Sequence, residues 1–239
     1  MLSEPTLAQP TILLTDCRTT FSTILKGSQF MNTAQPNPHH DRTIGDTAQR
    51  RVLLVGRSPA VLADTVSLLH DRGFTAEATN RFDHVLAEFD VRQVDLVVFG
   101  GQVPEERRAA LKRDIVARNE GVSFVQGLSG IPGLIARQVE GAFAPRDRDR
   151  ESPPCYDADE RAITLSLRQL RDVTVIAWWP TVSVPPNPLS DSLVLIERRL
   201  PKGMHSIPLP DVVPQDVSFV TVQVDEAIWA FRLPTPSRP

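Results

Sequence analysis

Residues 51–145 alternate strand-like and helix-like patterns of hydrophobic positions. Segments with apolar residues at helical spacing follow the strand-like runs, and residues 141–144 resemble a short stub of a fifth strand. Strands that alternate with helices are typical of a parallel sheet. The pattern predicts an α/β fold with a mostly parallel sheet of four or five strands. The expected strands are 52–55, 74–78, 95–99 and 122–126. One expected helix begins at Pro59, and the others cover 82–89, 104–119 and 131–139.

Helical periodicity ends in the second half of the chain. Strand-like runs rich in Val, Ile, Thr and aromatic residues recur there, separated by Pro, Asn and Asp. Several short strands of this kind predict an all-β sandwich. The expected strands are 161–168, 172–179, 192–199, 204–209, 217–224 and 226–233.

Changes in composition divide the chain into five parts. Residues 1–49 are rich in Thr, Ser, Pro, Gln and Asn and are expected to form a flexible arm, within which Met31 is an alternative start to Met1. A charged, proline-containing linker is expected between the two halves. The resulting parts are the arm 1–49, the α/β domain 50–145, the linker 146–158, the sandwich 159–234 and the tail 235–239.

Composition excludes several classes of function. A net charge of −3 gives no overall attraction to nucleic acid. No apolar run approaches the roughly 20 residues that a membrane helix needs. Cys17 and Cys155 lie far apart and belong to no metal-binding motif, so the sequence favours a reducing, cytoplasmic location.

Three motifs carry a resemblance to a known family. They are "VLLVGRSP" at 52–59, "VDLVVFGGQVP" at 94–104 and "VEGAFAP" at 139–145. In order and wording they resemble the first strand, the third strand with its loop, and a truncated fifth strand of the receiver domain of response regulators. The resemblance implies a flavodoxin-like fold. It also implies a pocket with two acids for Mg²⁺, an aspartate that accepts phosphate, and a lysine.

The residues at those positions cannot perform that chemistry. Gly56, Arg57 and Gly100 stand where the family has its acids, and Ala144 lies near the lysine position. Mg²⁺ prefers carboxylate oxygens, and phosphoryl transfer needs a carboxylate nucleophile. We therefore expect a degenerate receiver-like domain without phosphorylation or metal. Asp95 is a candidate acceptor only if the alignment slips by one residue, and a turn contact at the strand end is its simpler role.

Two loops remain as candidate ligand sites. Gly56, Arg57 and Ser58 precede a helix N-terminus and could bind an anion, although the G-x-G-x-x-G motif of dinucleotide-binding folds is absent. Ser129 and Gly130 lie between a strand and a helix as in a nucleophile elbow, but the second glycine is missing. A helix cap is the simpler role for Ser129. The histidines have no metal-ligand spacing; they are His39, His40, His70, His84 and His205.

The second half resembles a fibronectin type III or related immunoglobulin-like sandwich. The resemblance lies in "VTVIAWWP" at 173–180 and "VVPQDVSFVTVQV" at 212–224, where Phe219 stands at the position of the family's tyrosine. The adjacent Trp178 and Trp179 must point to opposite faces of a strand. An exposed tryptophan is a common binding anchor, so Trp178 and Trp229 are candidates for a partner surface. Alternatively, a loop or the first domain covers them.

These observations favour a non-catalytic regulatory or scaffold protein that acts through an unidentified protein partner. We expect no catalytic residue, cofactor, metal, nucleic acid or membrane interaction. One alternative is a nucleotide- or NAD(P)-binding Rossmann-like protein that uses the turn at Gly56, Arg57 and Ser58. The other is a structural component of an assembly.

Overall fold

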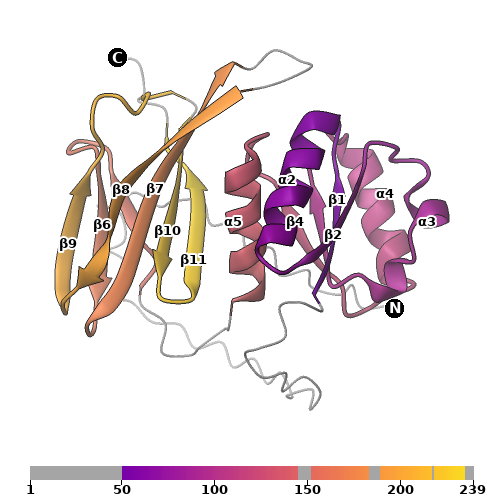
Figure 1. The fold of residues 1–239 in the computed structure, drawn as a ribbon, viewed down its shortest axis with the longest axis horizontal. Helices are drawn as coiled ribbons and strands as arrows, with labels where there is room; N and C mark the ends of the chain where they lie inside the picture. Colours follow the sequence, from indigo (N-terminus) through magenta and orange to yellow (C-terminus); the bar gives the residue numbers. More distant parts are fainter. Residues whose placement is uncertain (1–49, 145–151, 183–188, 217, 235–239) are drawn as a thin grey trace, which may run out of the picture.

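The protein consists of an α/β unit followed by a unit of antiparallel strands, and the two lie side by side (Figure 1). A computed structural model describes residues 50–144, 152–182, 189–216 and 218–234. The predicted arm and tail, with Cys17, His39 and His40, lie outside these ranges. The expected succession of an α/β part and a β part is confirmed.

The sheet of the α/β unit has four parallel strands in the order β2-β1-β3-β4. The chain passes from β1 to β2 on one side and then returns to place β3 and β4 on the other. The direction of winding therefore reverses between β1 and β3, whose last residues Val55 and Phe99 are paired. The strands are β1 (Arg51–Val55), β2 (Thr75–Thr79), β3 (Leu96–Phe99) and β4 (Ser123–Gln126).

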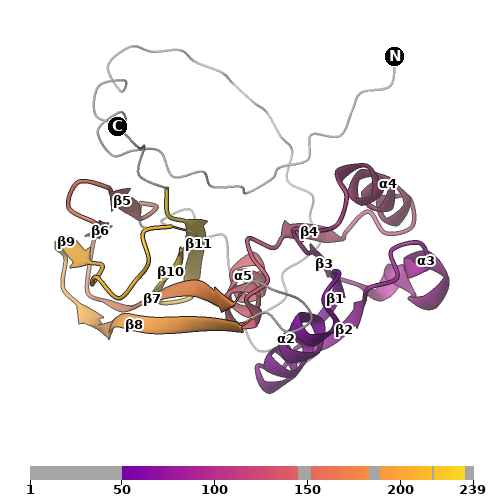
Figure 2. The same ribbon diagram turned by 90° about the horizontal axis from the view of Figure 1, so that it is seen from above.

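Helices cover both faces of this sheet (Figure 2). Leu54 and Val98 point to the face covered by α2 (Pro59–Asp71) and α5 (Pro132–Phe143). Leu53 and Val97 point to the other face, where α4 (Glu105–Val116) packs. A short helix α3 (Val85–Glu88) and a 3₁₀ turn (Val91–Gln93) complete the second face. Burial on both sides explains why β1 and β3 are continuous apolar runs.

The start of α2 follows from its sequence. The Ser58 hydroxyl oxygen accepts a hydrogen bond from the N–H of Val61 at 3.4 Å, and Pro59 occupies the first turn. Gly73, with φ of +83°, follows the last turn and permits the left-handed conformation that ends the helix. Ser58 and Gly73 therefore define the two ends of α2.

The short helix expected at 82–89 is present but is limited to α3. Two other expectations about the α/β unit and the linker are wrong. The expected fifth strand at 141–144 is absent, because α5 continues to Phe143, whose ring stacks on Phe74 with centroids 5.6 Å apart. Within the expected linker 146–158, residues Cys155–Asp157 form strand β5, which pairs with strand β6 (Ala162–Leu167).

The β unit contains two antiparallel sheets, ordered β11-β10-β7-β8 and β5-β6-β9. Buried residues of both sheets share one core, with Ile163 and Leu165 from one and Val175 and Val222 from the other. All six strands that the pattern predicts are present. Their bounds are β6 (Ala162–Leu167), β7 (Arg171–Val182), β8 (Leu189–Leu200), β9 (Gly203–Pro208), β10 (Phe219–Val224) and β11 (Ala227–Arg232).

Helix α5 joins the two units. Ile131, Leu134 and Phe219 form a buried cluster across the junction, and Trp178 packs against it. Arg137 donates a hydrogen bond to the Gln223 side chain at 3.0 Å. Figure 1 shows α5 between the α/β sheet and strand β11.

Two glycines on one face of α5 allow this close approach. A Cβ atom on Gly133 would lie 2.5 Å from the Trp178 ring, and one on Gly141 would lie 3.0 Å from the Ile228 carbonyl oxygen. Glycine in a helix interior costs about 0.5–1 kcal/mol relative to alanine. The close packing of α5 on the β unit offsets that cost.

The tryptophans proposed as a partner surface are covered within the chain. Trp229 is 8% exposed and lies in the core of the β unit with Trp179. Trp178 points the other way, as expected, but α5 covers it and its indole N–H donates to the Thr221 hydroxyl at 2.9 Å. Neither tryptophan forms the exposed anchor that the sequence suggested. For Trp178 the alternative holds, because the first domain covers it. No described helix combines the length and apolar composition that a membrane crossing requires.

Candidate functional site

A cavity of about 630 Å³ opens at the carboxyl ends of β1, β3 and β4. Its volume falls within the range of about 300–1,000 Å³ that is usual for small-molecule sites. Its position coincides with the reversal of winding between β1 and β3, where open α/β sheets commonly bind ligands. The lining residues are Leu54, Val55, Gly56, Arg57, Ser58, Pro59, Val61, Leu62, Thr65, Val98, Gly100, Gly101, Gln102, Gly127, Ser129, Gly130, Ile131, Ile135, Pro180 and Leu189.

A glycine directly follows each of the three strands that end at the cavity. The N–H groups of Gly56, Gly100 and Gly127 donate to carbonyl oxygens of neighbouring strands at 2.8–3.1 Å. A Cβ atom on Gly100 would lie 3.3 Å from the Cα atom of Gly56. The lack of side chains here lets β1 and β3 stay close while the space beyond their ends remains open.

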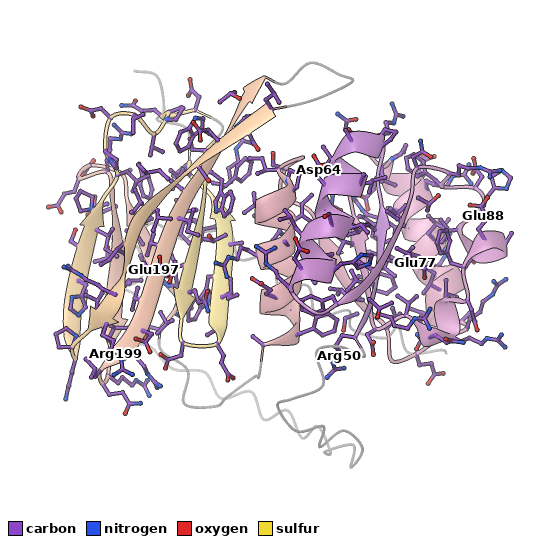
Figure 3. The ribbon with its side chains drawn as sticks, viewed as in Figure 1. Arg50, Asp64, Glu77, Glu88, Glu197 and Arg199 are labelled. Carbon is purple, nitrogen blue, oxygen red and sulfur yellow. The ribbon has the colours of Figure 1, made fainter. Side chains whose placement is uncertain are left out.

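Among the described residues that line the cavity, the one charged side chain is Arg57. Arg57 is exposed at the end of β1, and no carboxylate is among the lining residues. Of the acids labelled in Figure 3, Asp64 lies on α2 and Glu77 on β2, and neither reaches the lining. The cavity therefore has a positive rim.

Two helices begin at this rim. Ser58 and Pro59 belong to the start of α2, and Gly130 and Ile131 precede the first residue of α5. Helix α5 has no side-chain cap, so the expected capping role of Ser129 is wrong and Ile131 is the N-cap residue. The first N–H groups of a helix lack partners within the helix and carry a partial positive charge. Both helix starts add to the positive character of the rim.

The interior of the cavity is mostly apolar. Leu54 and Val98 come from the sheet, while Val61 and Ile135 come from α2 and α5. Leu189 of the β unit also lines the cavity, together with Pro180. The site thus combines a cationic rim with an apolar interior.

All five residues proposed from the sequence as a ligand turn line this cavity. Gly56, Arg57 and Ser58 come from the loop after β1, and Ser129 and Gly130 come from the loop after β4. Their meeting follows from parallel strands, whose carboxyl ends lie at one edge. Sequence reasoning missed the contribution of Gly101, Gln102, Gly127, Pro180 and Leu189.

The positions of the receiver-type acids fall at the same edge. Gly56 and Gly100 are neighbours there, whereas Ala144 follows a helix and no strand. Asp95 lies at the opposite, amino end of β3, where its carboxylate accepts the N–H of Arg51 at 2.8 Å. Asp95 therefore makes the strand-end contact that was its simpler interpretation. Among the described residues, no group of three His, Cys, Asp or Glu side chains could hold a metal.

A second notable side chain, Lys112, lies on the opposite face of the sheet. Its ammonium nitrogen is 5.9 Å and 5.6 Å from the ring centroids of Phe99 and Phe124. Burial lowers the pKa of Lys112, and the neighbouring Arg108 lowers it further. Lys112 does not line the cavity.

Comparison with known proteins leaves the family open. No family model matches the chain, and no curated protein matches it. Among solved structures, the chain is similar to an NAD kinase from Archaeoglobus fulgidus in complex with ATP, at 10% identity and a TM-score of 0.25. The match covers 76% of this chain and 83% of that chain. A TM-score this low supports no conclusion about function, so the receiver and fibronectin resemblances stay predictions.

Proposed function

We propose that this protein binds an anionic ligand of nucleotide size, in the class of ATP and NAD(P), in the cavity at the ends of β1, β3 and β4. The observation that carries the proposal is a cavity of about 630 Å³ in which Arg57 is the one charged lining residue within the part of the chain that the structure describes. The geometry thus favours the nucleotide-binding alternative over a purely regulatory role.

The phosphate groups of such a ligand are expected at the rim. Arg57 can donate two parallel hydrogen bonds to a phosphate, and the N-terminal ends of α2 and α5 add the partial positive charge of their helix dipoles. Gly56, Gly100 and Gly127 line the cavity and carry no side chain, so phosphate oxygens could approach the backbone there. Glycines from three loops would then allow the close approach of phosphate to the backbone that the motif G-x-G-x-x-G allows within one loop.

The strand order supports a finer assignment of the α/β unit. The order β2-β1-β3-β4 equals the first four positions of the flavodoxin-like arrangement, in which ligands bind at the β1/β3 switch point. We infer a flavodoxin-like unit of four strands, with α5 followed by the β unit where a fifth strand would come.

Replacing Arg57 by alanine should weaken nucleotide binding about tenfold, because a charge-assisted contact to phosphate is lost. Isothermal titration calorimetry with ATP, NAD⁺ and NADP⁺ measures this, and at least one of the three should bind the wild type. Arg113→Ala is the matched control, since Arg113 is an exposed arginine on α4 outside the cavity. Absence of binding by all three ligands, or equal affinity in Arg57→Ala and wild type, would contradict the proposal.

A non-catalytic regulatory role remains as a second candidate. The presence of glycine at positions 56 and 100, where the receiver family has acids, favours it because glycine offers no carboxylate for Mg²⁺ or for phosphoryl transfer. On this hypothesis a protein partner binds the chain and the three nucleotides do not. This second role would be supported if the wild-type protein recovers a defined protein partner and binds none of the three nucleotides.

A further inference from the structure

We infer that the β unit selects the ligand, with Leu189 as a specificity-determining residue that contacts a planar ring of the bound molecule. This inference rests on the proposed function, and it adds which end of the ligand each unit recognises. The α/β unit would hold the phosphates, and the β unit would hold the base.

Pro180 and Leu189 form one wall of the cavity, and this wall is an extension of strands β7 and β8. Strand β10 pairs with β7 only from Val173 to Trp178, but β7 continues to Val182 and pairs there with the beginning of β8. The pairing is irregular between Pro180 and Val182. Irregular pairing of this kind re-aims side chains. Figure 1 shows these strand ends leaning toward the α/β unit, and Pro180 and Leu189 both line the cavity.

The exposure of Leu189 fits contact with a ligand. Its side chain is 58% exposed although it lines a cavity with Leu62 and Ile131. Val194 on the same strand is similarly exposed, at 51%, but does not line the cavity. An apolar side chain at the mouth of an apolar cavity gains by contact with a flat, weakly polar ring. Leu189 and Pro180 therefore provide a surface for the base of a nucleotide.

The junction between the units holds this wall in place. Trp178 precedes Pro180 by two residues, and its ring lies against Gly133 near the start of α5. Its N–H bond to Thr221 keeps the ring in that position. Ile131 belongs both to the junction cluster and to the cavity lining. The junction therefore fixes the position of the wall relative to the rim.

These contacts define the ligand class by two parts, a phosphate group and an apolar ring. ADP contains both and is common to ATP, NAD⁺ and NADP⁺, whereas pyrophosphate contains only the anionic part. We expect the wild type to bind ADP at least about tenfold more tightly than pyrophosphate, as apolar pocket contacts usually discriminate by that factor or more.

The test compares ADP and pyrophosphate by titration calorimetry on three variants. Leu189→Asn should weaken ADP binding about five- to tenfold and leave pyrophosphate unchanged, because only the ring loses its contact. Val194→Asn, the matched control on the same strand, should change neither. Arg57→Ala should weaken both. Since Leu189 and Val194 are exposed, all variants should keep the wild-type melting temperature.

The outcomes separate the two proposals. If Arg57→Ala weakens both ligands but Leu189→Asn binds ADP as tightly as wild type, the role of the β unit is overturned and nucleotide binding stands. Equal weakening of ADP and pyrophosphate by Leu189→Asn also overturns that role. If the wild type binds neither ligand, the proposed function itself fails.

Discussion

Replacing Phe219 by alanine should lower the free energy of unfolding by about 3–5 kcal/mol, the usual cost of removing a buried phenyl ring. Phe219 is 5% exposed and packs with Ile131 and Leu134 of the α/β unit. The cavity left behind would lie in the junction itself, so the two units should unfold in separate steps. Urea unfolding followed by far-ultraviolet circular dichroism at the helix band reports the α/β unit. Tryptophan fluorescence reports the β unit, because Trp178, Trp179 and Trp229 all belong to it.

Phe231→Ala is the matched control for this prediction. Phe231 is also a buried phenylalanine, 3% exposed, but it lies in the core of the β unit. Its replacement should cost a similar free energy without changing the order in which the two probes respond. A loss below about 1 kcal/mol for Phe219→Ala, or a separation of the two probes equal to that in Phe231→Ala, would show that the junction does not couple the units.

Gly100→Val should reduce ADP binding by about two orders of magnitude, equivalent to about 2.8 kcal/mol. The first carbon of the new side chain would lie 3.3 Å from the Cα atom of Gly56 and 3.6 Å from the Val55 carbonyl oxygen. Both are backbone atoms, one at the end of β1 and one in the residue that follows it, and backbone atoms cannot turn aside. The remaining carbons would occupy the ligand space. Overpacking of this kind also lowers stability by about 1–3 kcal/mol. Titration calorimetry measures the affinity, and circular dichroism confirms that the variant is folded.

Gly121→Val provides the comparison. Gly121 lies in the turn before β4, and a Cβ atom there would meet only the Asn119 side chain at 3.5 Å, an ordinary contact. This variant should bind ADP with wild-type affinity. A folded Gly100→Val protein that binds ADP as tightly as Gly121→Val would place the ligand elsewhere.

Elements defined by local signals could be predicted from the sequence. The strand at β1, the Ser58 cap and the stop at Gly73 depend on neighbouring residues, and all are present. The end of α5 could not be predicted, because a short apolar run such as 141–144 fits a strand or a helix equally well. Phe143 packs on Phe74 and Gly141 packs on Ile228, and these contacts with residues distant in the sequence stabilise the helical conformation of 141–143.

The candidate site could be predicted in part for the same reason. Gly56 and Ser129 were recognisable because each follows a strand, and parallel topology brings the ends of strands together. Leu189 could not be found in this way, since its place in the cavity depends on how the β unit packs on α5. Trp178 was expected to face outward from its strand, but no local pattern shows that a helix covers it.

The glycine face of α5 limits how freely the two halves of this protein could be exchanged during evolution. Gly133 and Gly141 fit the ring of Trp178 and the backbone at Ile228, so α5 matches this particular β unit in shape. A recombination that joined the α/β half to another β module would leave Leu134 without its partner Phe219 and the glycines without a surface to meet. A module boundary placed after α5 would therefore separate residues that pack closely against each other.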